Sequence, residues 1–372
     1  MGEMMRKNLV VGAGFSGATI ANLLAENLNE EVVVIDRKPH IAGNCFDYLD
    51  ENKIMIHKYG SHIFHTNSEK VWNFLKKFTD FSTYMHEVIA IIDGIEANIP
   101  FNFNTLYKVF PNSLAERLER KLLEKFEYNK KVPILDFQSQ DDEDLKFLAN
   151  YIYEKVFLNY TSKQWGTSPE NIDGSVTARV PVYLSKDNRY FQDKYQGIPL
   201  DGYTSIVNKM LTHKRIKLML NTPYTSSKGY DRVFFTGSID EYFNYKYGVL
   251  PYRSVSFKFE EHDKEFYQSH ACVNYPNNYD FTRIHEYKHY LENKSSKTVI
   301  AKEYSEAFEI GKNDRYYPIS NDDTQKLYNM YQNDAKACGD VFFLGRLGDY
   351  RYYNMDSAIE RAIELYEEIK NL

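Results

Sequence analysis

The stretch Leu9–Gly17 constrains this chain more than any other part of its sequence. Three apolar residues, Leu9 to Val11, are typical of a buried strand, and Gly12, Gly14 and Gly17 follow at the spacing G-x-G-x-x-G. In a nucleotide-binding βαβ unit, the first glycine allows a tight turn, the second lets the backbone approach a pyrophosphate, and the third allows close packing of helix on strand. Apolar residues at helical spacing come next. The stretch therefore predicts a dinucleotide site at a helix N-terminus.

An acidic residue downstream supports this interpretation. Glu31–Ile35 predicts a second strand, and Asp36 follows it, about twenty residues after Gly17. A carboxylate at this point can accept a hydrogen bond from a ribose hydroxyl, which favours FAD or NAD over NADP. The neighbouring Arg37 leaves a phosphorylated ribose open. The alternative is a plain βαβ unit whose glycines only make a turn.

Length and composition exclude several classes of protein. A chain of 372 residues exceeds one ordinary core and predicts two or three domains. The net charge of −6 lacks the basic surplus of nucleic-acid-binding proteins. Three distant cysteines, Cys45, Cys272 and Cys338, favour a reducing cytoplasm over disulfides or zinc. No apolar run approaches the roughly 18 residues of a membrane span. We therefore expect a cytoplasmic protein with no nucleic-acid partner, no metal and no membrane span.

Three histidines lie close together after the second strand. The spacings between His57, His62 and His65 are five and three, which do not match a helical zinc pattern. His62 follows Gly60 in a turn that would lie at the cofactor edge, so it is the best functional candidate of the three. A structural role for His62 stays open.

Later segments predict how the rest of the chain is organised. Val88–Ile99 predicts a hairpin with an Asp-Gly turn, and Arg232–Phe235 predicts a parallel strand of the first sheet. The acidic run 141–143 predicts a helix start, and residues 160–166 predict a loop. Alternating residues between 252 and 304 predict a second sheet. Arg179 lies on a Gly/Pro-flanked loop, where it either clamps a phosphate or is simply solvated.

Several motifs together resemble the bacterial UDP-galactopyranose mutases, which are FAD-dependent isomerases. The resemblance runs nearly end to end and rests on residues 59–66, 160–166, 179–182, 195–199, 252–254, 316–318, 345–347 and 352–353. It implies an α/β fold with a Rossmann-like FAD-binding domain (1–80, 200–240 and 320–372). It also implies a small helical domain (104–170) and an antiparallel β-sheet domain (81–103, 171–199 and 241–319).

The same resemblance implies an activity. It is the interconversion of UDP-galactopyranose and UDP-galactofuranose, which supplies galactofuranose for cell-surface polysaccharide. In that family N5 of the reduced flavin attacks the anomeric carbon, UDP leaves, and the sugar is held as a flavin adduct while its ring opens and recloses. A homodimer is also implied, with NADPH or a reductase as the unknown reductant.

The resemblance further implies roles for individual residues. Arg179 and Arg283 would hold the diphosphate and act with His62 in catalysis, while Trp165, Tyr190 and Tyr160 would contact sugar and uracil. The expected cofactor-binding residues are Gly12, Gly14, Phe15, Ser16, Gly17, Asp36, Arg37, Gly43, Asn44, Tyr59, His62, Gly237, Arg346, Asn354, Met355 and Ser357. The expected substrate-binding residues are His86, Phe157, Tyr160, Thr161, Trp165, Arg179, Tyr190, Arg253, Asn274, Arg283, Tyr317 and Tyr352.

Two positions depart from the family pattern. Asn354 stands where relatives often carry Asp, and Ala42 stands where many carry Gly, which should cost little if its φ stays negative. Three alternatives stay open. They are the same ring contraction on UDP-N-acetylgalactosamine, a flavin oxidoreductase such as an amine oxidase on the same fold, and a flavin-bound structural or sensor protein.

Overall fold

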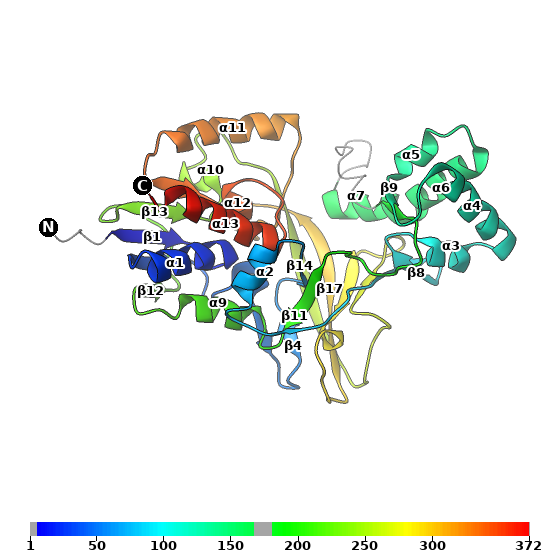
Figure 1. Cartoon of the computed structure of the whole chain (residues 1–372), viewed down its shortest axis with the longest axis horizontal. Helices are drawn as coiled ribbons and strands as arrows, with labels where there is room; N and C mark the ends of the chain where they lie inside the picture. Colours follow the sequence, from blue (N-terminus) through cyan, green and yellow to red (C-terminus); the bar gives the residue numbers. More distant parts are fainter. Residues whose placement is uncertain (1–5, 167–180, 372) are drawn as a thin grey trace.

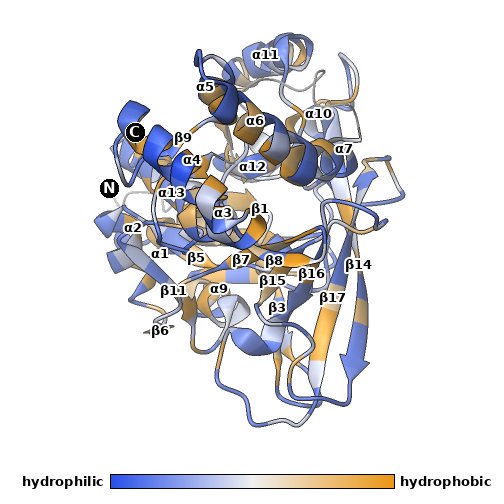
Figure 2. Cartoon of the chain, turned by 90° about the vertical axis from the view of Figure 1, so that its right-hand side faces the viewer, coloured by the Kyte–Doolittle hydropathy of each residue, from blue (hydrophilic) through white to orange (hydrophobic). Residues whose placement is uncertain are grey.

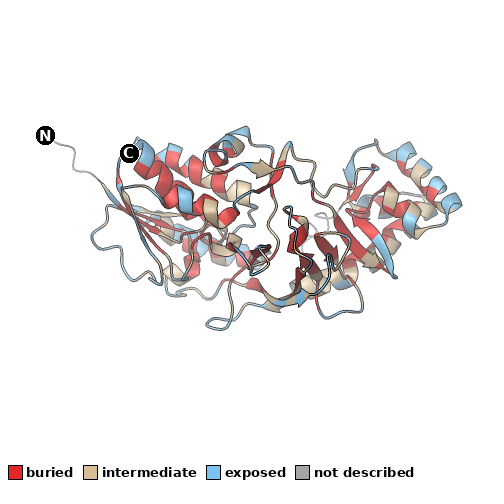
Figure 3. Cartoon of the chain, turned by 90° about the horizontal axis from the view of Figure 1, so that it is seen from below, coloured by how far each residue is buried: buried red, intermediate tan, exposed pale blue. Residues whose placement is uncertain are grey.

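The computed structural model describes residues 6–371 with the exception of 167–180. Along its long axis, a helix-covered sheet at one end is followed by a group of long strands and then by a group of helices (Figure 1). The buried residues concentrate in the strands and on the inner faces of the helices (Figure 3). The expected fold class, a Rossmann-like α/β domain with added helical and β parts, is confirmed.

The first sheet is fully parallel. Its strand order is β12 (Ile216–Met219), β2 (Glu31–Ile35), β1 (Lys7–Val11), β13 (Arg232–Phe235) and β19 (Val341–Phe343). Alternate residues of these strands face opposite sides, so both sheet faces are apolar. Val10, Val34 and Phe234 pack against the helices α1 (Phe15–Asn27), α9 (Tyr203–Leu211) and α13 (Met355–Ile369). The predicted return of residues 232–235 to this sheet is confirmed.

The other face of this sheet is covered differently. Leu9, Val33 and Val233 pack against Tyr224 and Tyr230 there. Next to them lies a cluster built on α10 (Ile239–Tyr242) and α11 (Asp322–Lys336). The sheet is thus buried on both sides, and its carboxyl ends are left to form a site.

The second sheet has seven strands. The order is β18 (Tyr317–Pro318), β14 (Tyr252–His262), β17 (Thr298–Ala307), β16 (Arg283–Glu286), β15 (Cys272–Asn274), β7 (Val88–Ile92) and β8 (Ile95–Ile99). The predicted hairpin Val88–Ile99 is confirmed as β7 and β8. The sheet is not wholly antiparallel, because β7 comes from an earlier part of the chain and pairs with β15 in parallel.

Three small sheets complete the β structure. They consist of β5 (Phe64–Thr66) with β11 (Tyr195–Pro199) and β6 (Phe81–Ser82), of β3 (Asp47–Leu49) with β4 (Met55–His57), and of β9 (Lys131–Val132) with β10 (Val182–Tyr183). The helix α2 (Glu69–Leu75) follows β5, and its Val71 and Leu75 join the core of the first sheet.

The helical part contains α3 (Phe103–Val109), α4 (Asn112–Lys125), α5 (Ile134–Gln138), α6 (Glu143–Ile152) and α7 (Asn159–Trp165). Figure 2 shows several of these helices with polar and apolar residues on different faces. The acidic run does start a helix, because the Asp142 carboxylate accepts hydrogen bonds from the backbone N–H groups of Asp144 and Leu145.

One element prediction is wrong. Residues 160–166 form most of the helix α7, where the sequence predicted a loop. A π-helical stretch, Tyr153–Leu158, continues α6 directly into α7, and Gly166 ends the helix with a φ of 67°. The mixture of polar and aromatic residues in α7 reflects a helix that lines a cavity. Within the described residues, no helix has both the length and the apolar character to span a bilayer. The domain boundaries stay a prediction.

Candidate active site

A cavity of about 570 Å³ lies at the carboxyl ends of the parallel strands; we call it the glycine cavity. Strand ends, the loop before α1 and the loops after β2 and β13 form its walls. Of the expected cofactor-binding residues, its lining contains Gly12, Gly14, Phe15, Ser16, Gly17, Asp36, Arg37, Gly43, Asn44, His62, Gly237, Arg346, Asn354 and Met355. This is the place where open α/β sheets bind their ligands.

The three glycines of the motif are required for different reasons. Gly12 has a φ of +107°, and a Cβ there would lie 2.0 Å from Thr236 Oγ1. A Cβ on Gly17 would lie 1.9 Å from the carbonyl oxygen of Gly12. Gly14 has an ordinary φ of −82°, and its Cβ would meet nothing closer than Gly43 Cα at 3.8 Å. The fold therefore requires Gly12 and Gly17, whereas Gly14 keeps space open for a bound molecule.

The helix α1 directs free donors into this space. Gly14 is its N-cap, the cap makes no side-chain hydrogen bond, and the first turn holds no acidic residue. The N–H groups of the first turn and the positive end of the helix dipole are thus available to an anion. At the start of α13, by contrast, the Asp356 carboxylate accepts the N–H of Ser357.

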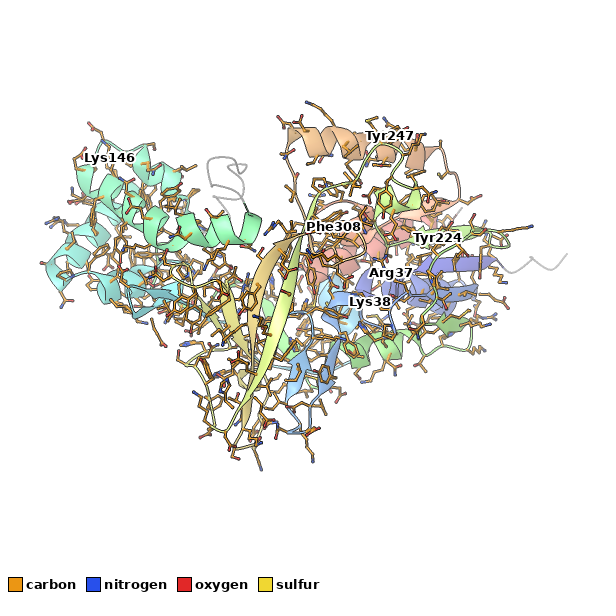
Figure 4. The ribbon with its side chains drawn as sticks, turned by 180° about the vertical axis from the view of Figure 1, so that it is seen from behind. Arg37, Lys38, Lys146, Tyr224, Tyr247 and Phe308 are labelled. Carbon is orange, nitrogen blue, oxygen red and sulfur yellow. The ribbon has the colours of Figure 1, made fainter. Side chains whose placement is uncertain are left out.

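Asp36 fixes the glycine turn to the end of β2. Its Oδ2 accepts the N–H of Ala13 at 2.8 Å, and its Oδ1 accepts the N–H of Lys38 at 2.8 Å. Each carboxylate oxygen keeps a further lone pair for a hydroxyl donor in the cavity. Arg37 pairs with Glu241 at 2.9 Å, and Glu241 also pairs with Arg315 at 3.1 Å, so the two arginines share one carboxylate. Figure 4 labels Arg37 and Lys38 in this half of the molecule and Lys146 at the opposite, helical end.

The expectation for Ala42 has to be corrected. Its φ is +68°, a left-handed conformation that costs a residue with a Cβ about 1 kcal/mol relative to glycine. The residue is buried, and its N–H donates to Ala13 O at 2.8 Å. This hydrogen bond to the glycine loop explains why the backbone keeps its left-handed conformation although the residue is alanine.

A second cavity of about 460 Å³ lies between α7 and the mixed sheet; we call it the tyrosine cavity. Six tyrosines from several parts of the chain line it together with two arginines. Of the expected substrate-binding residues, its lining contains His86, Phe157, Tyr160, Thr161, Tyr190, Asn274, Arg283, Tyr317 and Tyr352. Tyr59, expected near the cofactor, lines this cavity too, and its hydroxyl lies 2.7 Å from His40 Nε2.

Arg283 is the main cation within the tyrosine cavity. Its Nε lies 3.1 Å from Glu303 Oε1, and its guanidinium lies 5.9 Å from the centroid of the Tyr160 ring. Burial would raise the pKa of Glu303, but the charge of Arg283 and a hydrogen bond from His285 lower it to about 2. Glu303 is therefore ionised and holds Arg283 in place, while the remaining guanidinium N–H groups are available to an anion.

The two cavities share one rim. Asn44, His62, Arg346, Asn354 and Met355 line both of them. A molecule in the glycine cavity and a molecule in the tyrosine cavity would therefore meet at these five residues.

Arg346 is fixed at this rim by its neighbours. Its guanidinium donates to Tyr316 O at 3.2 Å and to Tyr353 O at 2.7 Å. It also lies 5.5 Å from the ring centroid of Tyr317 and 5.4 Å from that of Tyr352. The rim is thus positively charged and flanked by aromatic rings.

His62 reaches the rim as a neutral side chain. Its Nδ1 lies 2.7 Å from Gly60 O and so carries the proton, which leaves Nε2 as an acceptor. Burial, with a contribution from the charge of Arg346, lowers its pKa to about 4. His57 lies outside both linings, and its Nδ1 accepts the backbone N–H of His62. His65 lines the tyrosine cavity and lies 3.1 Å from Asp193.

Four expected site residues require separate description. Arg253 lies outside both linings and donates to Gln164 O at 2.9 Å, so it supports the end of α7. Ser357 also lies outside them. Trp165 belongs to α7. Arg179 lies outside the described residues.

Other lining residues were not expected from the sequence. Tyr224 and Tyr242 line the glycine cavity, with stacked rings 5.7 Å apart. Ser61, His285 and Glu303 line the tyrosine cavity. The only sequence signal for these residues was the spacing of Arg283 and His285, which places both side chains on one face of a strand. Glu303 lies opposite Arg283 because of the pairing register of β16 with β17, and it comes twenty residues later in the chain. In the part of the chain that the structure describes, His, Cys, Asp and Glu form no group of three or more able to hold a metal.

Comparisons with known families and sequences agree with this geometry. A family model described as UDP-galactopyranose mutase matches residues 155–352, and one described as an NAD(P)-binding Rossmann-like domain matches residues 10–78. The chain is 38% identical to dTDP-fucopyranose mutase from Escherichia coli, with 97% of each chain covered. It is 36% identical to a probable UDP-galactopyranose mutase from Klebsiella pneumoniae, covering 98% of this chain and 95% of the relative. With UDP-galactopyranose mutase from Mycoplasma genitalium the identity is 32%, over 97% of this chain and 94% of the relative.

Solved structures share the fold at lower identity. A crystal structure of reduced UDP-galactopyranose mutase matches with a TM-score of 0.74 and 16% identity, over 99% of this chain and 94% of the other. A putrescine oxidase double mutant matches with a TM-score of 0.60 and 12% identity, over 99% and 100%. At these identities the structural likeness concerns the fold alone.

Proposed function

The chain belongs to the UDP-galactopyranose mutase family, and on this premise we propose that it interconverts UDP-galactopyranose and UDP-galactofuranose on a reduced FAD. It is an enzyme of the isomerase class, and membership of the family implies a flavin cofactor. The identity of that flavin as FAD, its reduced state and the sugar substrate are our proposals.

The observation that carries the proposal is the common rim of the two cavities. A dinucleotide in the glycine cavity can reach His62 and Arg346, and so can a nucleotide sugar in the tyrosine cavity. This arrangement suits a reaction in which the cofactor itself contacts the substrate carbon. When bound and reduced, the flavin would supply the nucleophile that holds the sugar while its ring opens and closes.

The glycine cavity fits FAD in three respects. Gly14 leaves space that no protein atom uses, the start of α1 offers free N–H donors, and Asp36 keeps acceptor capacity for a ribose hydroxyl. The carboxylate of Asp36 argues against a phosphorylated ribose, because it would repel the added phosphate. We assign the remaining cofactor contacts to the rim residues Asn354 and Met355.

The tyrosine cavity fits the diphosphate of a nucleotide sugar. We assign Arg283 to the diphosphate, with Tyr317 and Tyr352 beside it, and we retain Arg179 as a second diphosphate arginine on the sequence motif alone. Tyr160, Tyr190, Trp165 and His86 are proposed to contact the base and the sugar. Arg253 is proposed as a positioning residue that acts through α7. His62, neutral at pH 7, would orient sugar and cofactor rather than act as a base.

A second substrate has specific support. The dTDP-fucopyranose mutase of Escherichia coli is 38% identical to this chain over nearly full length. Both substrates join a pyrimidine nucleoside diphosphate to a six-carbon pyranose, so one diphosphate site could serve either. The contraction of UDP-N-acetylgalactosamine has no comparable support among these relatives.

The proposal extends to the cellular setting. We expect a homodimer in the cytoplasm that provides furanose precursors for surface polysaccharide, with NADPH or a reductase as electron donor. These expectations rest on the resemblance of the sequence to the family.

The test compares substrates and oxidation states. Protein loaded with FAD is incubated, with and without dithionite, with UDP-galactose, dTDP-fucose or UDP-N-acetylgalactosamine, and furanose products are separated by chromatography. We expect UDP-galactofuranose from the reduced protein and almost none from the oxidised protein. Equal rates in both states would contradict the nucleophilic flavin, and faster turnover of dTDP-fucose would reassign the substrate.

A further inference from the structure

The tyrosine cavity contains a line of hydrogen-bonded side chains that the proposed function does not use. Ser61 Oγ lies 2.7 Å from His285 Nδ1, and His285 Nε2 lies 2.9 Å from Glu303 Oε2. His285 and Glu303 are only 2% and 4% exposed, yet all three residues line the cavity. The imidazole can therefore exchange protons only with its partners or with the contents of the cavity.

The backbone brings these side chains together. Gly60 has a φ of +94°, and a Cβ there would lie 3.0 Å from Phe257 Cζ, so only glycine lets this turn pack closely against β14. The turn delivers Ser61 to His285 on β16. Glu303 lies opposite Arg283 in the register of β16 and β17, so one carboxylate contacts both Arg283 and His285.

The hydrogen bonds define which atoms carry protons. Glu303 is ionised, so His285 Nε2 donates to it. His285 Nδ1 then accepts from Ser61 when the imidazole is neutral and donates to Ser61 when it is charged. When the imidazole of His285 is charged, the Ser61 hydroxyl can therefore donate its own proton toward the cavity.

The surroundings of His285 favour its charged state. The groups that face it are Glu303 from β17, Cys272 from β15, Arg283 from its own strand, His57 and His62 from the segment 57–62, and His86 from before β7. Burial lowers the pKa of His285, but its interactions with Cys272 and Glu303 outweigh burial and raise the pKa above its ordinary value. The buried carboxylate of Glu303 therefore favours the charged imidazole over the neutral one.

We propose that Ser61, His285 and Glu303 form a proton relay that protonates the ring oxygen of the sugar when the ring opens and accepts a proton when it recloses. The inference rests on the proposed function, because ring opening and reclosure need both transfers. Ser61 is the member that touches the sugar, and His285 and Glu303 act through it.

The transfers balance. When the bond between the anomeric carbon and the ring oxygen breaks, its electron pair stays on oxygen, which takes the Ser61 proton while His285 Nδ1 reprotonates the serine. The electron pair that the carbon gives up to oxygen would be replaced from the nitrogen of the reduced flavin of the proposed function, which would have released its own proton when it bonded to the carbon. On closure, the attacking hydroxyl forms the new bond to the carbon and its own proton passes through Ser61 to His285, while the flavin nitrogen would recover the electron pair.

The kinetic test uses FAD-loaded, reduced protein and whichever nucleotide sugar it converts. Ser61→Ala should lower kcat by roughly 10- to 100-fold with little change in KM, and Ser61→Thr, which keeps the hydroxyl, should recover most of it. Because the relay donates from charged His285, wild-type kcat should fall as the pH rises through the raised pKa of His285. His285→Gln keeps hydrogen bonding but cannot titrate, so this limb should disappear. Wild-type rates in Ser61→Ala, or an unchanged limb in His285→Gln, would overturn the relay.

A matched control and a second readout separate the relay from structural damage. His270 lies 2.8 Å from Ser269 Oγ and 3.6 Å from Glu87 at the surface, outside both cavities, so His270→Gln should leave rate and pH profile unchanged.

Imidazole NMR, with the His285 signal assigned by its loss in His285→Gln, should show a lower His285 pKa in Ser61→Ala than in wild type. An identical pKa would overturn the hydrogen bond. If wild type forms no furanose at all, the proposed function fails, and the NMR result still judges the Ser61–His285 contact.

Discussion

The two cavities that meet at His62 are built by opposite means. The phosphate end of the glycine cavity is shaped mainly by backbone: a glycine-rich turn, a helix N-terminus and strand ends. The tyrosine cavity is shaped by side chains that arrive from α7, β15, β16 and β18, far apart in the sequence. A cofactor site can thus be encoded in one short motif, whereas a substrate site depends on the long-range register of several strands.

The largest effects are expected from substitutions at two glycines of one motif: Gly14→Ala should weaken FAD binding, whereas Gly12→Ala should destabilise the fold. Gly14→Ala should fold with a normal Tm, because its Cβ would meet no protein atom closer than 3.8 Å, yet lower FAD affinity at least about 100-fold. Gly12→Ala should destabilise the fold by about 2 kcal/mol or more, because of its positive φ and the contact with Thr236. Thermal unfolding of apoprotein and FAD titration measure both. Normal FAD binding in Gly14→Ala would remove the backbone account of this cavity.

The next largest effect is expected on kcat/KM when the charge of Arg283 in the tyrosine cavity is removed. Arg283→Ala should lower kcat/KM by roughly 100- to 10,000-fold while the protein keeps its FAD, because a desolvated diphosphate contact is lost. Arg283→Lys keeps the charge opposite Glu303 and serves as the control for folding, with an intermediate rate. Steady-state kinetics and the flavin absorption spectrum provide the measurements. Full activity in Arg283→Ala would exclude this arginine from the site.

His62 lines both cavities, so the contrast between the glycine cavity and the tyrosine cavity does not apply to it. His62→Ala should lower the rate by roughly 10- to 1,000-fold and leave FAD bound. Because its pKa is about 4, the pH profile between 6 and 9 should keep its shape in the variant. Loss of FAD would make His62 structural, and an unchanged rate would direct attention to His65, which also lines the tyrosine cavity.

Buried histidines should make the fold sensitive to acid. Burial lowers the pKa of His62 to about 4 and that of His86 to about 3, so these groups take up protons only on unfolding. The free energy of unfolding should therefore fall as the pH drops from 6.5 toward 4, by roughly 1 kcal/mol per pH unit for each group. Urea titrations at pH 7.5 and 5.0 measure this. His86→Gln should reduce the loss; a loss as large as that of wild type would contradict the assignment.

The smallest effect concerns the glycine cavity again. Ala42 holds a φ of +68°, so Ala42→Gly should stabilise the fold by about 0.5–1 kcal/mol. Chemical denaturation of the apoprotein is sensitive enough to detect it. A destabilised variant would mean that packing of the buried methyl group outweighs the backbone strain.

The sequence predicted local features well. The glycine motif, the strand ending before Asp36 and the hairpin at Val88–Ile99 each depend on neighbours within about thirty residues. It failed at residues 160–166, where composition suggested a loop, because a π-helical stretch carries α6 into α7. The relay of Ser61, His285 and Glu303 was not predictable, because three separate segments meet there.

Flavin spectroscopy can show whether the two cavities form one site across the rim of His62 and Arg346. UDP-galactose is titrated into FAD-loaded wild type and Arg283→Ala while the flavin absorbance and fluorescence are recorded. We expect a saturable spectral change in wild type, because the sugar reaches the flavin ring, and a much weaker affinity in the variant. If equilibrium dialysis detects bound UDP-galactose while the flavin spectrum stays unchanged, the cofactor and the substrate do not meet, and the account is contradicted.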